Sequence, residues 1–190
     1  EPRMHQRALR EEFDRINWVN DADDFARWTE GRTGFPIVDA GMRQLVATGR
    51  LHNRVRMIAA SFLVKDLLVD WRKGEAFFRH HLIDADPSQN VGNWQWVAGT
   101  GPDASPYFRV FNPTVQSRKF DRDGEYIRRW VPELRSLMGD SAHDPASAAP
   151  LDLLEAGVIL GVHYPEPIVD HQQARRTAIE VYGLASRGQL

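Results

Sequence analysis

The spacing of apolar residues constrains the fold of this chain more than any other feature. Apolar side chains recur every three or four residues almost throughout, and the strict alternation typical of strands is nearly absent. From residue 53 to about residue 70 they cover most of a helix circumference, which indicates a helix buried on several sides. These residues are Val55, Ile58, Ala59, Phe62, Leu63, Leu67 and Leu68. The pattern predicts an all-α, multi-helix protein with this helix at its centre.

Further helices fit the same period on both sides of the central one. We expect them after Pro36 up to Gly49, and over residues 74–82, 120–137, 151–156 and 168–185. Gly49 stands where a C-terminal cap belongs, and Pro132 interrupts one of these helices. Residues 83–111, rich in Gly, Asn, Asp and Pro, are predicted to be irregular, and residues 138–150 to form a linker. Functional residues often lie in such irregular segments.

Length and composition limit the class of protein. A chain of 190 residues fits one domain and can bury a core without disulfides or metals. It contains no cysteine, which excludes disulfides and thiolate metal sites. No apolar run approaches the roughly 20 residues that span a bilayer, and the first residues lack the apolar stretch of a signal peptide. We therefore expect a cytoplasmic protein without a membrane partner.

The charge is distributed unevenly along the chain. The formal net charge is -2, which by itself argues against a nucleic-acid partner. Between Arg43 and His80, however, eight basic residues stand against three acidic ones, a local balance of +5. The basic residues are Arg43, Arg50, Arg54, Arg56, Lys65, Arg72, Lys73 and Arg79. One face of the protein is therefore predicted to be basic and able to bind phosphates.

Tryptophan is frequent in this chain, and two of its tryptophans lie only two residues apart. Of the six tryptophans, Trp94 and Trp96 flank Gln95 inside the segment predicted to be irregular. One interpretation is that both rings fill a helical core. The other is that they form a stacking platform for a base or a planar cofactor. The spacing alone leaves both interpretations open.

Two carboxylates, Asp84 and Asp86, lie just ahead of the tryptophan pair. An Asp-x-Asp pair can cap a helix, polarise a cofactor or bind a divalent metal, and capping is the commonest of these roles. A metal would need further ligands, and His80 and His81 are near in sequence, but such a pair is more often an ordinary surface feature. We predict no metal site.

Two arginines, Arg54 and Arg56, lie on the helix that is predicted to be buried. A buried charge is costly unless it is paired. Asp84 or Asp86 would be a suitable partner.

Three motifs of this chain resemble the photolyase and cryptochrome family. The first is Thr33–Leu45, which reads TGFPIVDAGMRQL, and the second is Asn53–Leu67, which is followed by Trp71 and Arg72. The third runs from Asp84 to Trp96 and precedes the turn Phe111-Asn112-Pro113. The resemblance extends over nearly the whole chain and is strongest to class I photolyases, which act on cyclobutane pyrimidine dimers. It implies the C-terminal part of an FAD-binding helical domain, incomplete at its N-terminal side.

The resemblance also implies roles for the residues that bind the flavin. Asn53 corresponds to a polar residue between flavin and substrate, and Asp84 and Asp86 correspond to carboxylates that line the flavin. Arg56 would pair with Asp84 and keep positive charge near an anionic flavin. Asn90 corresponds to the amide that faces the redox-active nitrogen of the ring.

Further roles concern DNA and electron transfer. Trp96 and Met57 resemble residues of the cavity that receives the flipped dimer, and Arg54 resembles a phosphate or substrate contact. Trp94, Trp71 and Trp18 match three tryptophans that relay an electron from the surface to photo-oxidised flavin. The implied activity is that of a deoxyribodipyrimidine photolyase. Excited, fully reduced FAD would pass an electron to a pyrimidine dimer in damaged DNA and recover it after the ring splits.

In family members an α/β domain, which binds an antenna pigment such as a folate or a deazaflavin, precedes the helical domain. We expect that domain and the first helices of the FAD domain to be absent from residues 1–190, and we expect a monomer. One alternative is a cryptochrome that binds flavin without repairing DNA, but Asn90 and the pair Asn53 and Met57 favour a photolyase. The other alternative is a non-catalytic helical fragment.

Overall fold

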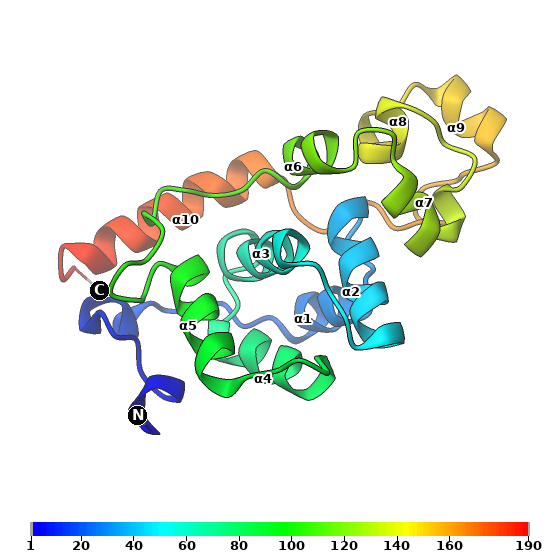
Figure 1. Cartoon of the computed structure of the whole chain (residues 1–190). Coiled ribbons are helices and arrows are strands. Elements are labelled where there is room, and N and C mark those ends of the chain that lie inside the picture. Colours follow the sequence, from blue (N-terminus) through cyan, green and yellow to red (C-terminus); the bar gives the residue numbers. More distant parts are fainter. Residues whose placement is uncertain (1, 190) are drawn as a thin grey trace. The chain divides into compact units, whose positions relative to one another are not determined.

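The computed structural model describes residues 2–189, with side chains from Met4 onward. Among these residues no β-strand forms, and an isolated bridge between Leu160 and Tyr164 is the strand-like feature recorded. The all-α prediction is therefore confirmed (Figure 1). The chain divides into two compact units, which are described separately below. Unit 1 is formed by Glu1–Phe25, Ala60–Val110 and Val169–Leu190, and unit 2 by Ala26–Ala59 and Phe111–Ile168.

Short and medium helices build both units. Unit 1 contains α4 (Trp71–His81), α5 (Pro87–Ala98), α10 (His171–Ser186), the 3₁₀ turns η1 (Pro2–His5) and η2 (Glu11–Arg15), and the π-helical turn η3 (Phe62–Asp66). Unit 2 contains α2 (Pro36–Thr48), α6 (Pro113–Phe120), α7 (Glu125–Trp130), α8 (Asp140–His143), α9 (Pro150–Ala156), and the 3₁₀ turns η4 (Pro132–Leu134) and η5 (Pro145–Ser147). The boundaries between the units fall within α1 (Ala22–Thr29) and α3 (Asn53–Ser61).

The core of unit 1 forms around the π-helical turn η3. Phe62, Leu63 and Val64 are fully buried there, as the continuous apolar pattern predicts. The helix predicted over residues 53–70 is nevertheless shorter, because α3 gives way to η3 and Leu68 adopts a left-handed backbone with φ 48°. Helix α10 packs on η2 and η3 through an apolar cluster. The cluster comprises Ala8, Phe13, Ile16, Leu68, Ala178, Tyr182 and Ala185.

The buried carboxylate of Asp39 organises the start of α2 in unit 2. It accepts hydrogen bonds from the main-chain N and the Oγ1 of Thr33, at 2.7 and 2.6 Å, and from the N of Gly34 at 3.1 Å. The hydroxyl of Tyr164 donates to Oδ2, the oxygen that also accepts from Gly34, at 2.5 Å, while both bonds from Thr33 go to Oδ1. Helix α2 ends at Gly49 with φ 66°, which confirms the predicted cap. The motif that begins at Thr33 thus has a structural role, because Asp39 links the start of α2 to the distant segment that contains Tyr164.

Two sequence predictions about irregular segments are wrong. Residues 87–98, predicted to be irregular, form helix α5, because Asp86 caps its first turn and Gly99 ends it with φ 82°. Residues 138–150, predicted to be a linker, contain α8 and η5. Ser117 and His143 anchor this segment with a buried contact of 2.7 Å between Oγ and Nδ1.

The helix predicted over residues 120–137 is also shorter in the structure. Helix α6 ends at Phe120, and α7 covers only Glu125–Trp130 before the 3₁₀ turn η4. The side chain of Asp121 starts α7, since its oxygens accept from the main-chain N of Tyr126 and Ile127. The predicted last helix begins at His171, after the capping residue Asp170.

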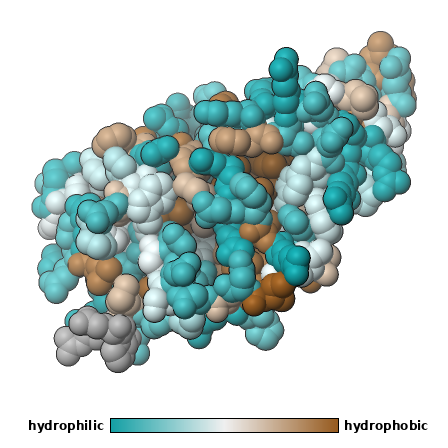
Figure 2. Space-filling view, viewed as in Figure 1, coloured by the Kyte–Doolittle hydropathy of each residue, from teal (hydrophilic) through white to brown (hydrophobic). Residues whose placement is uncertain are grey.

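Unit 2 exposes apolar side chains at α9 and the turn that follows it. Leu151, Leu154, Ile159 and Val162 are all exposed there. Figure 2 shows brown, hydrophobic atoms at the upper right, where Figure 1 places α9. The predicted helix over residues 151–156 is confirmed as α9.

Candidate functional site

Helix α3 places four of the predicted site residues within unit 2. Asn53 is exposed, while Arg54, Arg56 and Met57 are half-buried. The amide Nδ2 of Asn53 lies 3.8 Å from the sulfur of Met57, one turn along the helix. Arg56 donates from Nε to the carbonyl oxygen of Leu51 at 2.7 Å. The sequence placed these residues on a buried helix, but their part of α3 lies at the surface of unit 2.

Arg54 is part of a cationic and aromatic surface in the same unit. Its guanidinium carbon lies 4.6 Å from the centre of the Phe120 ring, and the ammonium of Lys119 lies 5.5 Å from the same ring. Phe120 is 48% exposed. A ring flanked by two cations can contact a base or a sugar while the cations meet phosphates.

The carboxylates predicted to line the flavin lie in unit 1, at the start of α5. Asp86 accepts from the main-chain N of Gln89 at 2.8 Å, so it caps the helix as the commonest interpretation predicted. Asp84 is exposed two residues earlier. The predicted pair of Arg56 and Asp84 joins residues of different units and stays a prediction.

Asn90 has a fixed orientation in unit 1. It is 9% exposed and lies on the first turns of α5. Its Nδ2 donates to the main-chain oxygen and to Oε1 of Glu75, each at 3.0 Å. Within the part of the chain that the structure describes, no hydrogen-bond donor contacts Oδ1 of Asn90. The amide therefore presents a hydrogen-bond acceptor in a set direction.

Sequence reasoning missed Glu75, although it is the buried partner that orients Asn90. Its side chain also forms an ion pair with Arg79, one turn along α4, at 3.3 Å. An acidic residue on a helix is usually a surface residue. The spacing of 15 residues between Glu75 and Asn90 gives no signal of their contact.

The three tryptophans predicted to relay electrons all lie in unit 1. Trp94 on α5 and Trp71 on α4 are 2% and 1% exposed, whereas Trp18 is half-buried. Trp18 meets the ring of Tyr182 edge-on, with centroids 6.2 Å apart. Trp94 and Trp71 are therefore more buried than Trp18, and their role as a relay stays a prediction.

Trp96 faces away from Trp94 because residues two apart on a helix point to nearly opposite sides. It is half-buried, while Trp94 is packed edge-on against Phe78 with ring centroids 5.0 Å apart. Trp94 is thus a core residue, as the first interpretation of the pair held. Trp96 remains available for stacking.

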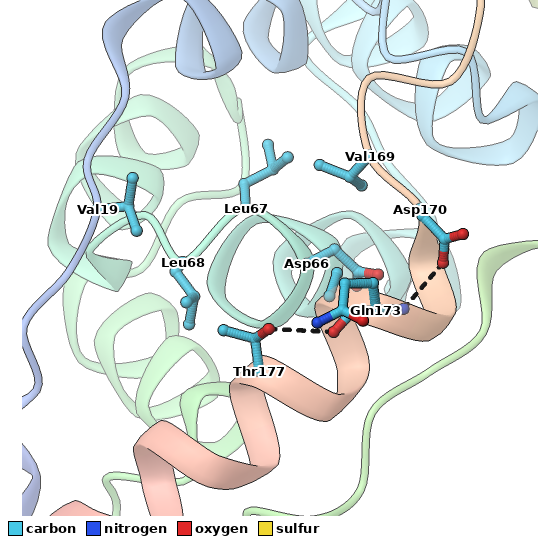
Figure 3. A pocket seen from close by; sticks show the side chains of 9 residues that line it. Val19, Asp66, Leu67, Leu68, Val169, Asp170, Gln173 and Thr177 are labelled. Carbon is cyan, nitrogen blue, oxygen red and sulfur yellow. Dashed lines mark hydrogen bonds between the residues drawn. The ribbon is translucent and has the colours of Figure 1, made fainter.

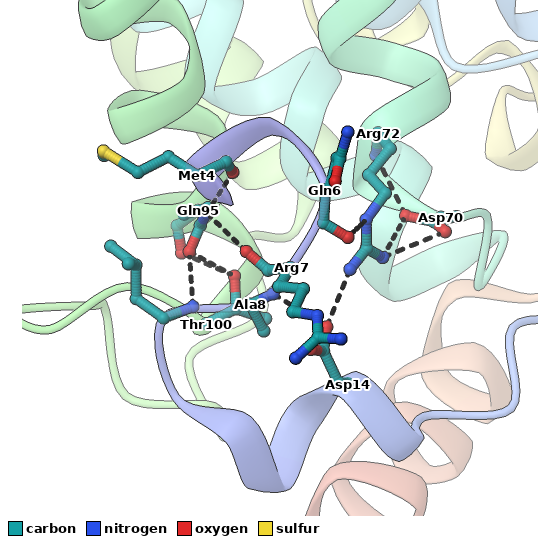
Figure 4. Close-up of polar contacts among 10 residues, drawn as sticks. Met4, Gln6, Arg7, Ala8, Asp14, Asp70, Arg72, Gln95 and Thr100 are labelled. Atoms are coloured by element: carbon teal, nitrogen blue, oxygen red, sulfur yellow. Dashed lines mark hydrogen bonds and ion pairs between the residues drawn. The ribbon is translucent and has the colours of Figure 1, made fainter. Parts of the chain in front are cut away.

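The N-terminal segment that precedes Trp18 is tied to α4 and α5 (Figure 4). Buried Gln95 donates to the carbonyl oxygens of Met4 and Arg7, at 2.9 and 3.1 Å, and its Oε1 accepts from the N of Leu9 at 3.0 Å. Arg72 donates from Nη2 to Asp14 at 2.7 Å. These four long-range hydrogen bonds, made by the side chains of Gln95 and Arg72, therefore hold the segment that leads to Trp18.

The guanidinium of Arg72 also lies 4.9 Å from the centre of the Trp71 ring. Its Nη1 contacts both oxygens of Asp70 at 3.2 Å. Trp71 therefore lies beside the positive charge of Arg72, which is paired with the carboxylates of Asp14 and Asp70.

Lys65 in η3 is a buried cationic residue that the sequence assigned only to a basic face. Its Nζ lies 3.2 Å from the centre of the Tyr182 ring and donates to the carbonyl oxygens of Ala98 and Tyr107, at 3.2 and 3.4 Å. Burial lowers the pKa of Lys65 well below its usual value. This residue does not contribute to a basic surface.

Unit 1 contains a cavity of about 270 Å³ beside α10 (Figure 3). The lining residues are Val19, Asp66, Leu67, Leu68, Val169, Asp170, Gln173, Ala174 and Thr177. None of them is a predicted site residue. Asp66, behind Gln173, contacts His171 with 2.5 Å between Oδ1 and Nδ1, and its Oδ2 is buried without a hydrogen bond.

The described part of the chain lacks two features, a metal-binding cluster and a membrane-spanning helix. Residues 2–189 contain no group of three or more His, Cys, Asp or Glu side chains arranged to bind a metal ion. None of the described helices is long and apolar enough to cross a membrane.

Comparison with known proteins relates this chain to DNA photolyases at the level of both family and individual sequences. The FAD binding domain of DNA photolyase matches residues 1–183. A deoxyribodipyrimidine photo-lyase of Agrobacterium fabrum is 54% identical over 98% of this chain, and that of Escherichia coli is 54% identical over 92%. The chain spans only 39% and 36% of the lengths of these two relatives.

Solved structures agree with the sequence relatives. A bacterial class III photolyase from Agrobacterium tumefaciens matches 98% of this chain, and 39% of its own, with a TM-score of 0.95 and 54% identity. A cryptochrome of Synechocystis matches 88% of this chain, and 35% of its own, with a TM-score of 0.84 and 42% identity.

Proposed function

Because this chain belongs to the FAD-binding domain family of DNA photolyases, we propose that it forms part of a light-driven enzyme that splits pyrimidine dimers in DNA. The match over residues 1–183 is the observation on which this proposal depends. The relatives named as photolyases are longer than this chain, so their whole activity is proposed for the protein of which these residues are a part.

A bound FAD would supply light absorption and one-electron chemistry. The residues proposed to contact it are Asn53, Arg56, Asp84, Asp86 and Asn90. Asn90 supports this assignment, because Glu75 occupies both of its donor bonds and leaves Oδ1 as an acceptor. An acceptor in a fixed direction suits the N–H that a reduced flavin ring presents at its redox-active nitrogen. The carboxylates of Asp84 and Asp86 and the guanidinium of Arg56 can form charge-assisted hydrogen bonds with the remaining polar groups of the flavin.

The electron relay is proposed to run through Trp94, Trp71 and Trp18. The buried positions of Trp94 and Trp71 protect a transient radical from water, and the half-buried Trp18 gives access to reductants in solution. The sequence distances among the three rings give no hint of this order of burial. The proposal is supported by all three residues lying in one compact unit.

DNA is proposed to meet the side chains of Asn53, Arg54, Met57 and Trp96. Arg54 supports this, because its guanidinium lies over exposed Phe120 beside Lys119. A dimer is poorly stacked, so flipping it out of a duplex costs less than flipping an intact pair. Phosphate contacts would make binding dependent on salt concentration.

The first test is a titration of the purified chain with FAD, followed by the visible spectrum and fluorescence of the flavin. We expect saturable binding with a perturbed spectrum. Asn90→Ala should weaken binding several-fold through loss of one oriented hydrogen bond. Gln89→Ala, at an exposed position of the same helix, should leave it unchanged. Binding of FAD to Asn90→Ala as tight as to the unchanged chain would contradict the role assigned to Asn90.

A second test addresses repair. Trp96→Ala should abolish most repair of a dimer-containing oligonucleotide by the complete flavin-loaded protein, at unchanged stability. Normal repair by that variant would show that Trp96 does not contact the dimer.

A cryptochrome without repair activity is the second candidate, because a cryptochrome structure matches this chain at 42% identity. Binding of FAD without any repair of a dimer-containing oligonucleotide would favour it. A chain that binds neither FAD nor DNA would favour a non-catalytic fragment. The monomeric state and the cytoplasmic location stay predictions.

A further inference from the structure

Gly74 lies in the middle of α4, where glycine destabilises a helix relative to alanine. The ring of Trp94 from α5 lies against it. A Cβ atom added at Gly74 would come within 2.6 Å of Cζ3 of Trp94 and 2.6 Å of Cδ2 of Leu63, and still closer to Cη2 of Trp94. Such approaches are sterically forbidden. The six-membered edge of the Trp94 ring therefore occupies the space that any side chain at residue 74 would need.

Gly74 also marks the side of α4 on which Trp71 lies. Trp71 precedes it by three residues, and residues three apart share a helix face. Phe78, one turn beyond Gly74, meets the Trp94 ring edge-on. Trp94 therefore lies along the face of α4 that begins at Trp71, fixed by Gly74 and Phe78.

We infer that Gly74 is a positioning residue for electron transfer, because its missing side chain lets the Trp94 ring approach the helix face of Trp71. This inference rests on the proposed function, since the approach matters only if the two rings exchange an electron. In that exchange Trp94 gives one electron to the light-excited oxidised flavin, and Trp71 gives one to Trp94. Trp18 then gives one to Trp71, and a thiol in solution returns one to Trp18.

The test compares Gly74→Ala with Gly92→Ala. Gly92 lies on α5, and a Cβ added there meets no atom within 4 Å, so both changes add one methyl group to a helix but only one causes a clash. In the flavin-free chain, Gly74→Ala should change the tryptophan bands of the near-ultraviolet circular dichroism, whereas Gly92→Ala should not. Identical spectra of the two variants would overturn the inference.

The functional part of the test uses the flavin-loaded protein. With a thiol present, Gly74→Ala should slow the light-driven bleaching of oxidised flavin several-fold. Dimer repair after chemical reduction of the flavin should stay unchanged, because that reaction does not draw on the relay. A residue with a purely structural role would lower both rates together.

Trp71→Phe distinguishes failure of the inference from failure of the proposed relay. If bleaching continues at the normal rate in Trp71→Phe, the relay is wrong and the role of Gly74 is wrong with it. If Trp71→Phe abolishes bleaching while Gly74→Ala behaves like Gly92→Ala, the relay stands and only the role of Gly74 is wrong.

A rescue variant covers the case in which Gly74→Ala does not fold. Adding Trp94→Phe removes the ring atoms that make the closest clash, and the remaining neighbour, Cδ2 of Leu63, is the end of a side chain that can turn away. The double variant should therefore fold again. If it fails to fold while Trp94→Phe alone folds, the contact between Gly74 and Trp94 does not control this position, and the inference falls.

Discussion

One amide group joins Asn90 to Glu75 through two hydrogen bonds, because Nδ2 of Asn90 lies 3.0 Å from both the main-chain oxygen and Oε1 of Glu75. The contact connects the first turns of α5 to the middle of α4. Because the amide nitrogen of Asn90 donates both of its hydrogen bonds to Glu75, the direction of the amide oxygen is fixed.

Glu75→Ala should therefore destabilise the chain. It removes a buried hydrogen bond to a charged acceptor, which is worth about 1.5–3 kcal/mol. Arg79→Ala is the matched control, because it removes only the ion pair of Glu75 with a half-exposed arginine, worth about 1 kcal/mol or less. Urea denaturation of both variants measures the difference. Equal losses would show that the ion pair, and not the amide contact, is the important interaction of Glu75.

Tyr164→Phe should lower the free energy of unfolding, because it removes the hydrogen bond that links Tyr164 to Asp39 at the start of α2. Its hydroxyl donates to the buried carboxylate of Asp39, and a hydrogen bond to a charged group contributes about 1.5–3 kcal/mol. Tyr126→Phe is the control, since that hydroxyl donates at 2.6 Å to the neutral amide oxygen of Gln44. We expect Tyr126→Phe to cost about 1 kcal/mol. Urea titrations of both variants measure their free energies of unfolding. A larger loss of stability in Tyr126→Phe than in Tyr164→Phe would contradict the assigned role of Asp39.

Asp66 should make stability depend on pH. Burial raises the pKa of Asp66 from 3.8 to about 6, although the hydrogen bond with His171 opposes the rise. The folded chain therefore binds this proton more tightly than the unfolded chain. The resulting stabilisation is complete below about pH 4 and is lost as the pH rises through about 6.

Asp66→Asn removes this dependence. Relative to the unchanged chain, the variant should gain about 3 kcal/mol of stability between about pH 4 and pH 8. Asp103→Asn, at an exposed position, controls for the loss of one negative charge. Urea denaturation across this range measures the difference. A constant difference between Asp66→Asn and the unchanged chain would rule out the buried carboxylate as a source of pH dependence.

Gln95→Ala should release the N-terminal segment from α5. The side chain makes three hydrogen bonds with the main chain of Met4, Arg7 and Leu9, so the segment would lose its attachment while the helix remains. Hydrogen exchange of residues 4–9 should become faster, and trypsin should cleave at Arg7 more readily. Gln89→Ala, exposed on the same helix, should change neither. Unaltered exchange in Gln95→Ala would mean that contacts such as Arg72 to Asp14 suffice.

The local order of the chain could be predicted from the sequence because its causes are local. The all-α class follows from a period of three to four residues, and the ends of α2 and α9 follow from the positions of Pro36, Gly49 and the apolar residues near 151. Helix α5 has start and stop signals at Asp86, Pro87 and Gly99, but the Gly and Asn content of the same segment predicts irregular structure, so the two local signals conflict there.

The order of the motifs, by itself, also determined the family to which the chain belongs. Their length and spacing are specific, and the comparison over residues 1–183 confirmed the resemblance. The role of each site residue does not follow from that match and stays a proposal.

Only the tertiary structure decided which distant residues meet. Asp39 and Tyr164 are 125 residues apart, Asp66 and His171 are 105 apart, and neither contact leaves a periodic signal in the sequence. The same holds for the clash that excludes a side chain at Gly74, since it depends on where α5 places the ring of Trp94. Helical periodicity reports which side of a segment is buried, whereas the choice of partner depends on packing among all segments at once.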